Sequence, residues 1–241
     1  MVNDMNKKLI IAILSTIVIG LLIHYTMETA SFGELLSITY GYISFKNYSS
    51  LAITFIKWII PQLLLIYFWG NYLEENLISR LNYILTRTNK LEKYLLHNYL
   101  MLMLYVLLIC SVLYLITLAV TVLGGNGVKI DADSIKNMIM YFLYMFLVLV
   151  VINTISIFIN AAYAVFAVIG IQAVFLVVTK YVFDGLISKE LYRFFPISNA
   201  LFYYNNNLYN GGFLYQLIFL FFGIVVIILL NIFTLKNKEV L

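Results

Sequence analysis

The chain has 241 residues, of which 63% are hydrophobic and 11% are charged, and its mean hydropathy is +0.98. A soluble domain carries roughly 25% charged residues, so this composition leaves too few polar side chains to cover a water-facing surface. The formal net charge of +4 is small and forms no basic block, which argues against a nucleic-acid partner. The composition therefore predicts an integral membrane protein.

Apolar runs long enough to cross a bilayer recur along the chain. A transmembrane helix needs about 20 apolar residues for a hydrocarbon core about 30 Å thick. The stretch 138–178 would measure about 60 Å as one helix, so we expect it to fold back near Asn160. The predicted fold is an all-α membrane protein in which residues 1–241 form a single transmembrane domain. Its six spans are expected at about 9–25, 51–68, 99–123, 138–159, 161–178 and 213–235.

Basic residues favour one side of these six spans. Two lysines precede the first span, two follow the last, and the segment 70–98 between the second and third spans carries four more basic residues. Since Lys and Arg accumulate on the cytoplasmic side of a membrane, the bias predicts that both termini and segment 70–98 face the cytoplasm. The segment 179–212, between the fifth and sixth spans, then lies on the outer side.

The cytoplasmic segment 70–98 shows an amphipathic pattern. Its leucines recur at helical spacing, whereas its charged residues fall largely on other faces. One interpretation is an interfacial helix that anchors the neighbouring spans. The other is a docking element for a cytoplasmic protein, because an apolar ridge flanked by charges suits helix-in-groove recognition. The residues expected to form this docking surface are Leu73, Glu74, Glu75, Leu77, Arg80, Leu81, Ile84, Arg87 and Lys90.

The outer segment 179–212 holds two amphipathic stretches separated by Pro196. Apolar residues from Phe183 to Phe195 follow a three-and-four spacing, and proline ends that pattern because it interrupts a helix. The two short helices predicted here either dip into the outer leaflet, where any freed backbone must be buried or wetted, or lie flat as an interfacial aromatic belt. The residues expected at an outer gate are Phe194, Phe195, Pro196 and Asn199.

Polar residues inside the spans are few. A lysine at the bilayer centre costs about 2.5–3.5 kcal/mol on insertion scales, and less if the side chain snorkels to the interface. Intramembrane amides and hydroxyls either line a pathway or hydrogen-bond neighbouring helices together. The candidate pathway residues are Lys57, Gln62, Asn153 and Thr154.

Motifs for catalysis and metal binding are not found in the sequence. The single cysteine, Cys110, can form neither an internal disulfide nor a Cys/His metal site. The glycine-rich stretch 124–129 lacks the Gly-Lys-Ser/Thr order of a phosphate-binding loop. Glu74-Glu75 precedes Arg80 by one residue too many for a glutamate-dependent intramembrane protease. We therefore expect no catalytic residue, no metal and no cofactor in this chain.

The six-span layout and the cytoplasmic segment resemble the permease subunits of type-2 ABC exporters, in particular those of bacteriocin and other antimicrobial peptides. The residues that carry the resemblance are Glu75 and the run Ile84-Leu85-Thr86-Arg87-Thr88-Asn89-Lys90. The resemblance implies that segment 70–98 grips a cytoplasmic ABC ATPase subunit, which binds ATP and Mg²⁺. It also implies a re-entrant hairpin that closes the outer end, and a second permease, identical or a sister chain.

The function implied by this resemblance is that of a permease subunit of an ATP-driven exporter in a bacterial plasma membrane. It would move a peptide-like or other amphipathic substrate out of the cell, while ATP hydrolysis takes place in the separate subunit, so this chain is not expected to be an enzyme. The alternative is a non-transporting membrane immunity or scaffold protein that binds a toxin peptide. The same six spans would serve that role.

Overall fold

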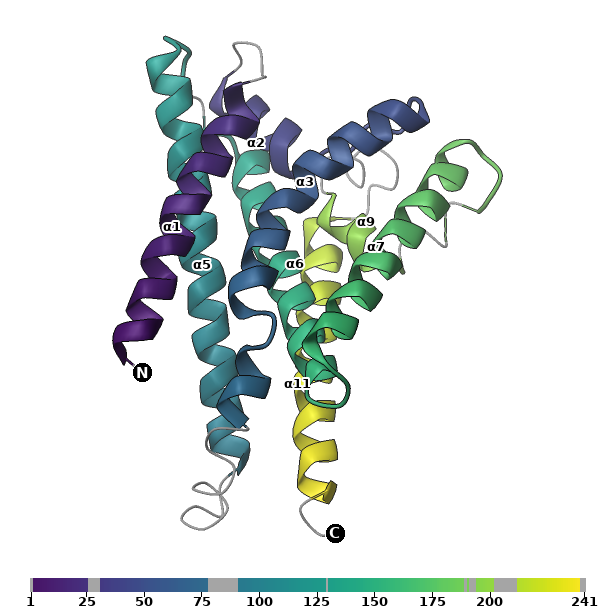
Figure 1. Ribbon diagram of the computed structural model, residues 1–241. Coiled ribbons are helices and arrows are strands. Elements are labelled where there is room, and N and C mark those ends of the chain that lie inside the picture. Colours follow the sequence, from purple (N-terminus) through teal and green to yellow (C-terminus); the bar gives the residue numbers. More distant parts are fainter. Residues whose placement is uncertain are drawn as a thin grey trace.

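The computed structural model describes residues 2–25, 31–77, 91–128, 130–188, 190, 194–201 and 212–238, and regular structure in these ranges is entirely helical. Both termini lie toward one end of an elongated helical bundle (Figure 1); we call it the terminal end, and the opposite end, which carries α2, the distal end. The described helices are α1 (Val2–Tyr25), α2 (Phe32–Tyr40), α3 (Tyr48–Trp69), α5 (Leu91–Leu123), α6 (Ala132–Ser156), α7 (Ala161–Phe183), α9 (Pro196–Ala200) and α11 (Phe213–Lys238).

Among the described residues, 6 helical segments are long and apolar enough to cross a membrane. This confirms the prediction of an all-α chain with six potential spans. Several helices extend beyond the expected spans, since α5 begins at Leu91, α6 at Ala132, and α7 continues to Phe183. The segments with membrane-spanning character are Lys7–His24, Tyr48–Leu77, Leu91–Leu123, Ala132–Ser156, Ala161–Phe183 and Phe213–Lys236.

The chain reverses between α6 and α7, as the length of the apolar stretch required. Asn160 has an extended backbone at the N-cap position of α7, and its side-chain oxygen accepts a hydrogen bond of 2.8 Å from the backbone N–H of Ala162. Such a cap satisfies one of the N–H groups that the first turn of a helix leaves unpaired. The predicted turn near Asn160 is therefore confirmed.

The predicted helix over residues 183–195 is wrong for its first part. α7 ends at Phe183, Gly185 has a φ of +77°, and the described residues 184–188 are not helical. The N–H of Leu186 donates to the carbonyl of Tyr181 (2.9 Å) and that of Gly185 to Val182 (3.2 Å). This pair of bonds around a left-handed glycine is the Schellman ending of a helix, so a local glycine overrides the apolar spacing that suggested continuation.

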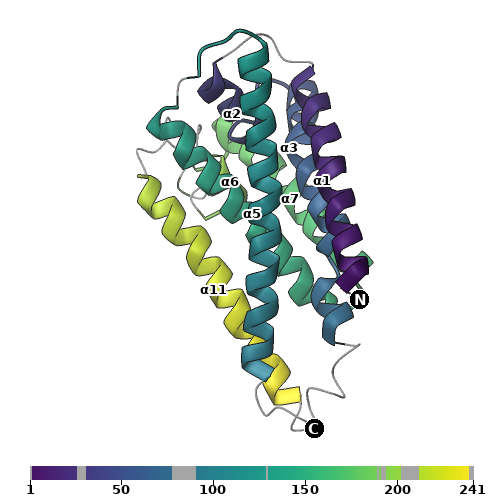
Figure 2. The same cartoon turned by 90° about the vertical axis from the view of Figure 1, so that its left-hand side faces the viewer.

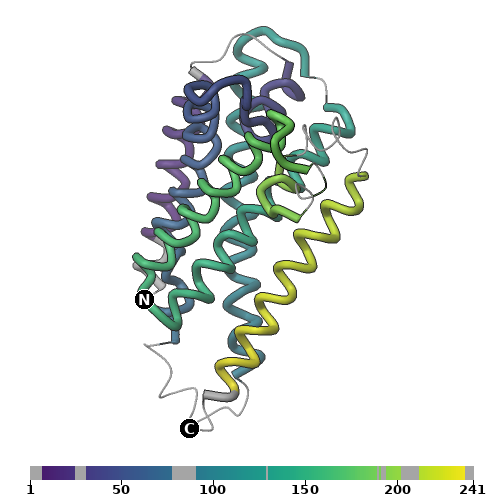
Figure 3. Tube along the Cα trace, turned by 90° about the vertical axis from the view of Figure 1, so that its right-hand side faces the viewer, coloured from purple at the N-terminus to yellow at the C-terminus, as the bar shows by residue number. Residues whose placement is uncertain are grey.

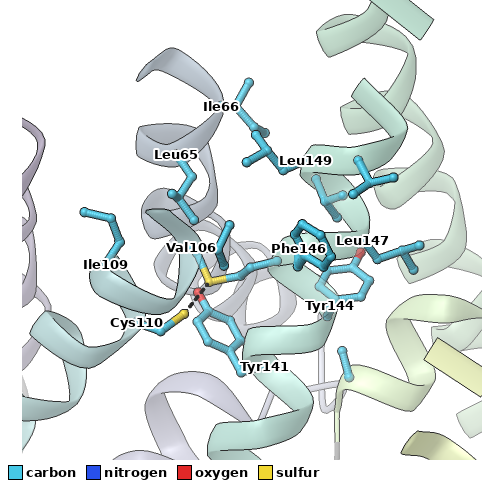
Figure 4. Packing of buried hydrophobic residues seen from close by; sticks show 14 of the residues in the cluster. Leu65, Ile66, Val106, Ile109, Cys110, Tyr141, Tyr144, Phe146, Leu147 and Leu149 are labelled. Atoms are coloured by element: carbon cyan, nitrogen blue, oxygen red, sulfur yellow. Dashed lines mark hydrogen bonds between the residues drawn. The ribbon is translucent and has the colours of Figure 1, made fainter. Parts of the chain in front are cut away.

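α6 forms the centre of the bundle. It packs against α2, α3, α5, α7, α9 and α11, and every side chain from Tyr144 to Val150 is buried. A helix that is apolar on all faces belongs in a protein interior. Figure 4 shows Tyr141 of α6 beside Cys110 of α5. The Cys110 Sγ atom lies 3.6 Å from Met145 Sδ. The lone cysteine is thus a buried packing residue.

The outer helices surround this core. α5 runs nearly the full height of the bundle between α1 and α11 (Figure 2), whereas α11 forms one edge of the molecule (Figure 3). In the most apolar stretch of each helix, only 22% of the α7 residues and 17% of the α11 residues are buried, against 61% of the α6 residues. Their exposed side chains are large and apolar, including Phe166, Phe221 and Phe222. In a membrane these faces contact lipid or another apolar helix.

Replacing Gly41 with alanine is expected to loosen α2 from the core. Asn137 of α6 is buried and donates from Nδ2 to the carbonyl of Leu36 (3.0 Å), which fixes α2 on α6. A Cβ at Gly41 would overlap the side-chain oxygen of Asn137. Overpacking of this kind costs about 1–3 kcal/mol, measurable as a lower free energy of unfolding in detergent. Gly127→Ala is the control, because no atom lies within 4 Å of a Cβ there; equal stabilities of the two variants would contradict this packing.

Candidate functional site

α3 ends in a break, and the residues after it begin the segment predicted to dock a cytoplasmic partner. α3 stops at Trp69, Gly70 and Asn71 form a turn, and helix resumes over residues 72–77. Figure 1 places this short helix near the terminal end of the bundle. We call residues 69–77 and the side chains that contact them the helix-break site.

Asn153 of α6 bridges the break with its side-chain amide. Its Nδ2 donates to the carbonyl oxygens of Trp69 (2.7 Å) and Leu149 (3.0 Å), and its Oδ1 accepts from the backbone N–H of Leu73 (2.9 Å). Asn153 itself is 0% exposed. A buried backbone group without a partner costs about 1–3 kcal/mol, so this one side chain removes the penalty on both sides of the break.

The two acidic residues after the break differ in their exposure. Glu75 is exposed, and its carboxylate accepts bonds from Lys8 of α1 (3.3 Å) and from Asn71 (2.8 Å). Both side chains of the Lys8–Glu75 pair are about half exposed, and such pairs contribute only about 0.2–1 kcal/mol. Glu74 is half-buried, and its Oε2 has no hydrogen-bond partner within the described ranges. The carboxylate of Glu75 is therefore within reach of a partner, whereas Oε2 of Glu74 is buried.

The apolar residues after the break face the bundle. Leu73 is 0% and Leu77 6% exposed, and Leu77 packs against Leu91 and Leu95 of α5. The Tyr94 hydroxyl also donates to the carbonyl of Asn76 (3.2 Å). The apolar ridge that we expected to face a partner thus faces α5 and α6, because burying it inside the chain removes it from water or lipid headgroups. Ile157, Ile232 and Leu235 complete this cluster at the ends of α6 and α11.

The structure therefore separates the predicted docking residues into two groups. Leu73 and Leu77 do not reach the surface, which corrects their assignment as docking residues, whereas Glu75 is exposed and Glu74 is half-buried. The others, Arg80, Leu81, Ile84, Arg87 and Lys90, lie outside the described residues, and their docking role stays a prediction.

Three of the four candidate pathway residues bond to other helices. Gln62 of α3 is buried and accepts from Nε2 of Gln172 on α7 (3.4 Å). Asn153 bridges the helix break, and Thr154 Oγ1 lies 3.0 Å from the Tyr99 hydroxyl of α5. Lys57 is half-buried on α3. Three of the four therefore join helices together, and a role in lining a pathway stays a prediction for all of them.

The predicted outer-gate residues lie around the start of α9. The ring of Phe195 stacks on that of Phe175 from α7, with centroids 4.8 Å apart. Its carbonyl oxygen accepts from Ser198 Oγ (2.6 Å) and Asn199 Nδ2 (3.0 Å), and Pro196 is the first residue of α9. Phe194 is 65% exposed. The structure thus brings Phe195, Pro196 and Asn199 together and leaves Phe194 on the surface.

α9 is buried although it is short. From Ile197 to Ala200 each residue is 0% exposed, and the helix packs against α6, α7 and α11. Figure 1 shows it beside α6 and below the distal end of α7. A helix of polar and small residues therefore occupies the interior of the bundle on its distal side.

Two polar arrangements were missed in the sequence. The Tyr99 hydroxyl, besides contacting Thr154, accepts from Nδ2 of Asn231 on α11, which links three helices through buried groups. Lys180, in the last turn of α7, is 6% exposed and binds both carboxylate oxygens of Asp184 (3.1 and 3.0 Å). The sequence held one signal for each arrangement. The first was Asn231, the single Asn in the apolar run of α11, and the second was the four-residue spacing of Lys180 and Asp184.

The distal end carries a cavity of about 540 Å³, lined by Gly33, Glu34, Ser37, Ile38, Tyr42, Asp131 and Asp133. Its three carboxylates are already engaged. Glu34 accepts from Ser31 (2.9 Å) and Asp133 from Lys136 (2.8 Å). Asp131 accepts from the hydroxyl and N–H of Ser134, which lowers the pKa of the Asp131 carboxyl. Glu34 and Asp131 thus cap the starts of helices, and Asp133 forms an ion pair. Within the described ranges, no group of three His, Cys, Asp or Glu side chains could hold a metal.

The fold and these sites define a multi-pass, all-helical membrane protein with six potential spans. A family model described as Protein of unknown function (DUF2705) matches residues 9–241. The match covers nearly the whole chain, and the chain belongs to this family. No curated protein and no solved structure matches this chain.

Proposed function

We propose that this chain is the membrane-spanning permease subunit of an ATP-driven ABC exporter in a bacterial plasma membrane. The observation that carries the proposal is the helix-break site, which turns the end of α3 into a short helix at the terminal end of the bundle. Its exposed carboxylate, that of Glu75, stands beside the half-buried Glu74 where the chain leads into the basic residues of segment 78–90. Charges of both signs beside a fixed helix suit a protein interface whose register is set electrostatically.

In this proposal the terminal end faces the cytoplasm. ABC ATPase subunits bind ATP and Mg²⁺ and dock on the helix-break site and on residues 78–90, while a second permease, identical or a sister chain, completes the pathway. ATP binding supplies the free-energy difference between two packings of the helices, and the permease supplies those packings. The buried helix α9 supports a distal closure, because it fills the interior between α6, α7 and α11.

The substrate class proposed is a peptide or another amphipathic molecule. The exposed surfaces of the helices are long and apolar and carry few charges. A strongly hydrophilic substrate would therefore find few polar groups to bind along them. If the chain instead binds a toxin peptide in the absence of any ATPase subunit, the immunity or scaffold function replaces the exporter.

Charge reversal at Glu75 is expected to release the ATPase subunits. The tagged chain is purified from its bacterial host in mild detergent, and ATPase subunits are identified by mass spectrometry through their nucleotide-binding motifs. We expect Glu75→Lys to lower their yield about tenfold or more, because like charges at an interface repel by several kcal/mol. The fold should survive, since Glu75 contributes only a half-exposed ion pair.

The matched control is Glu190→Lys, the same charge reversal at an exposed position near the distal end. It should leave the yield of ATPase subunits unchanged. Absence of ATPase subunits from the unaltered chain, or equal losses in both variants, would contradict the proposed function.

A further inference from the structure

The helix break interrupts the backbone hydrogen bonds of α3, and a side chain from α6 enters the gap. In an α-helix the N–H of residue i bonds to the carbonyl of residue i−4, and Leu73 and Trp69 form such a pair. Here the Leu73 N–H donates to Asn153 Oδ1 and the Trp69 carbonyl accepts from Asn153 Nδ2 (2.9 and 2.7 Å). The amide of Asn153 is therefore inserted between the two partners of a single helical bond.

The helical pattern continues on both sides of this insertion. Gly70 N–H donates to Ile66 (2.7 Å), and Glu75 N–H donates to Asn71 (2.9 Å), each across four residues. Insertion of a side chain into the ladder is one of the known causes of a sharp kink. A Cβ at Gly70 would lie 2.5 Å from the Ile66 carbonyl oxygen, so the kinked form also requires glycine at that position.

Withdrawal of the amide leaves a defined alternative. The Leu73 N–H and the Trp69 carbonyl are already spaced as helical partners in sequence, so they can bond to each other and continue α3 through residues 72–77. With the amide inserted or withdrawn, both backbone groups have a hydrogen-bond partner, as buried backbone groups require.

The amide belongs to the helix that contacts most of the bundle. α6 packs against α2 and α9 on the distal side as well as α3 and α5, so a shift of α6 reaches the distal end. The short helix 72–77 contacts α1 through Lys8–Glu75 and α5 through Leu77. Anything that moves the short helix therefore acts on Asn153, and through it on α6.

We propose that Asn153 is the latch that couples the helix-break site to α6. Inserted, it holds the end of α3 kinked against α5; withdrawn, it lets α3 close its hydrogen bond and straighten. The coupling rests on the proposed function, since docked ATPase subunits would drive the short helix between the two positions. Asn153 is in this sense a positioning residue and need not touch the substrate.

Two variants should favour the straight form by independent routes. Asn153→Leu removes the inserted amide at similar volume. Gly70→Ala places a Cβ where the kinked form has no room and also raises the helix propensity of the break. The controls are Ser156→Ala, which removes only a bond of 3.0 Å to the Asn153 carbonyl within α6, and Gly170→Ala in α7, where a Cβ meets nothing within 4 Å.

The shape of α3 is read out first, without any partner. Spin labels at positions 53 and 75, both exposed, are placed in a chain carrying Cys110→Ala, and their distance is measured by electron paramagnetic resonance in detergent. Asn153→Leu and Gly70→Ala should lengthen the distance, whereas Ser156→Ala and Gly170→Ala should not. An unchanged distance in both test variants overturns the latch. If one of them fails to fold, the other decides alone.

Coupling is read out next in vesicles that contain the chain and its ATPase subunits. The probe is a fluorescently labelled cationic amphipathic peptide, and its uptake into inside-out vesicles is divided by ATP hydrolysed. The two test variants should lower this ratio about tenfold while hydrolysis persists, because the short helix would then move without moving α6. Parallel loss of uptake and hydrolysis, or an unchanged ratio, overturns the coupling. Absence of ATPase subunits from the unaltered complex refutes the proposed function, and the spin-label distance still decides the latch.

Discussion

Replacing Asp184 with alanine is expected to destabilise the distal end by about 2 kcal/mol. The side chain of Lys180 is only 7% exposed, whereas that of Asp184 is 41% exposed, so the mutation leaves a buried ammonium group without its counter-ion. Breaking a fully buried pair costs about 3–5 kcal/mol. The expected loss is smaller because Lys180 keeps the Phe45 carbonyl at 3.4 Å and the Tyr48 ring at 5.0 Å.

The opposite substitution should be milder. Lys180→Met leaves a carboxylate that water reaches, so we expect a loss of about 1 kcal/mol or less, and Lys180→Met/Asp184→Ala should be no less stable than Asp184→Ala alone. The measurement is the free energy of unfolding in detergent, arranged as a double-mutant cycle. Asp133→Ala, at the exposed pair with Lys136, is the control and should change little. A larger loss for Lys180→Met than for Asp184→Ala would show that the pair is not organised as described.

Replacing Tyr99 with phenylalanine is expected to cost about 1–3 kcal/mol. The hydroxyl group joins Thr154 of α6 and Asn231 of α11 to α5, and Asn231 is only 1% exposed. Its removal leaves a buried amide without this partner, in a region where neither water nor lipid replaces it. The effect should appear as earlier unfolding in detergent and as faster separation of α11 from α5.

A second substitution tests the cause of that loss. Asn231→Leu in the Tyr99→Phe background removes the stranded amide at similar size, and replacement of both partners by apolar groups is close to neutral. The double variant should therefore regain stability relative to Tyr99→Phe. Tyr67→Phe, on a side chain that is 81% exposed, serves as the control and should be silent. Failure of the second substitution to restore stability would contradict the network.

The helices of this protein follow from its sequence more closely than its polar contacts do. The apolar runs and the bilayer thickness predict the six spans, and Asn160 marks the turn within the longest run, because length and capping are local properties. The helical extension of the third span over residues 91–98 was missed, since it involves Leu91 and Leu95 packing against Leu77, a contact between residues that are not neighbours along the chain.

The candidate site was predictable only in part for the same physical reason. The pattern identified Glu75 as a surface residue, but it also assigned the neighbouring leucines to an exposed ridge. An amphipathic helix shows which residues share a face and not what that face contacts. Asn153 was noticed as a polar residue in a span, yet its insertion between Trp69 and Leu73 requires α3 and α6 to lie side by side.

The orientation of the bundle is tested most directly by cysteine labelling in living cells. In a chain carrying Cys110→Ala and expressed alone, single cysteines replace Glu75 at the helix-break site and Gly127 at the distal end, both at exposed positions. A membrane-impermeant maleimide is predicted to label position 127 in intact cells and position 75 only after the membrane is opened. Labelling of position 75 in intact cells would contradict the cytoplasmic placement of the helix-break site and, with it, the docking of an ATPase there.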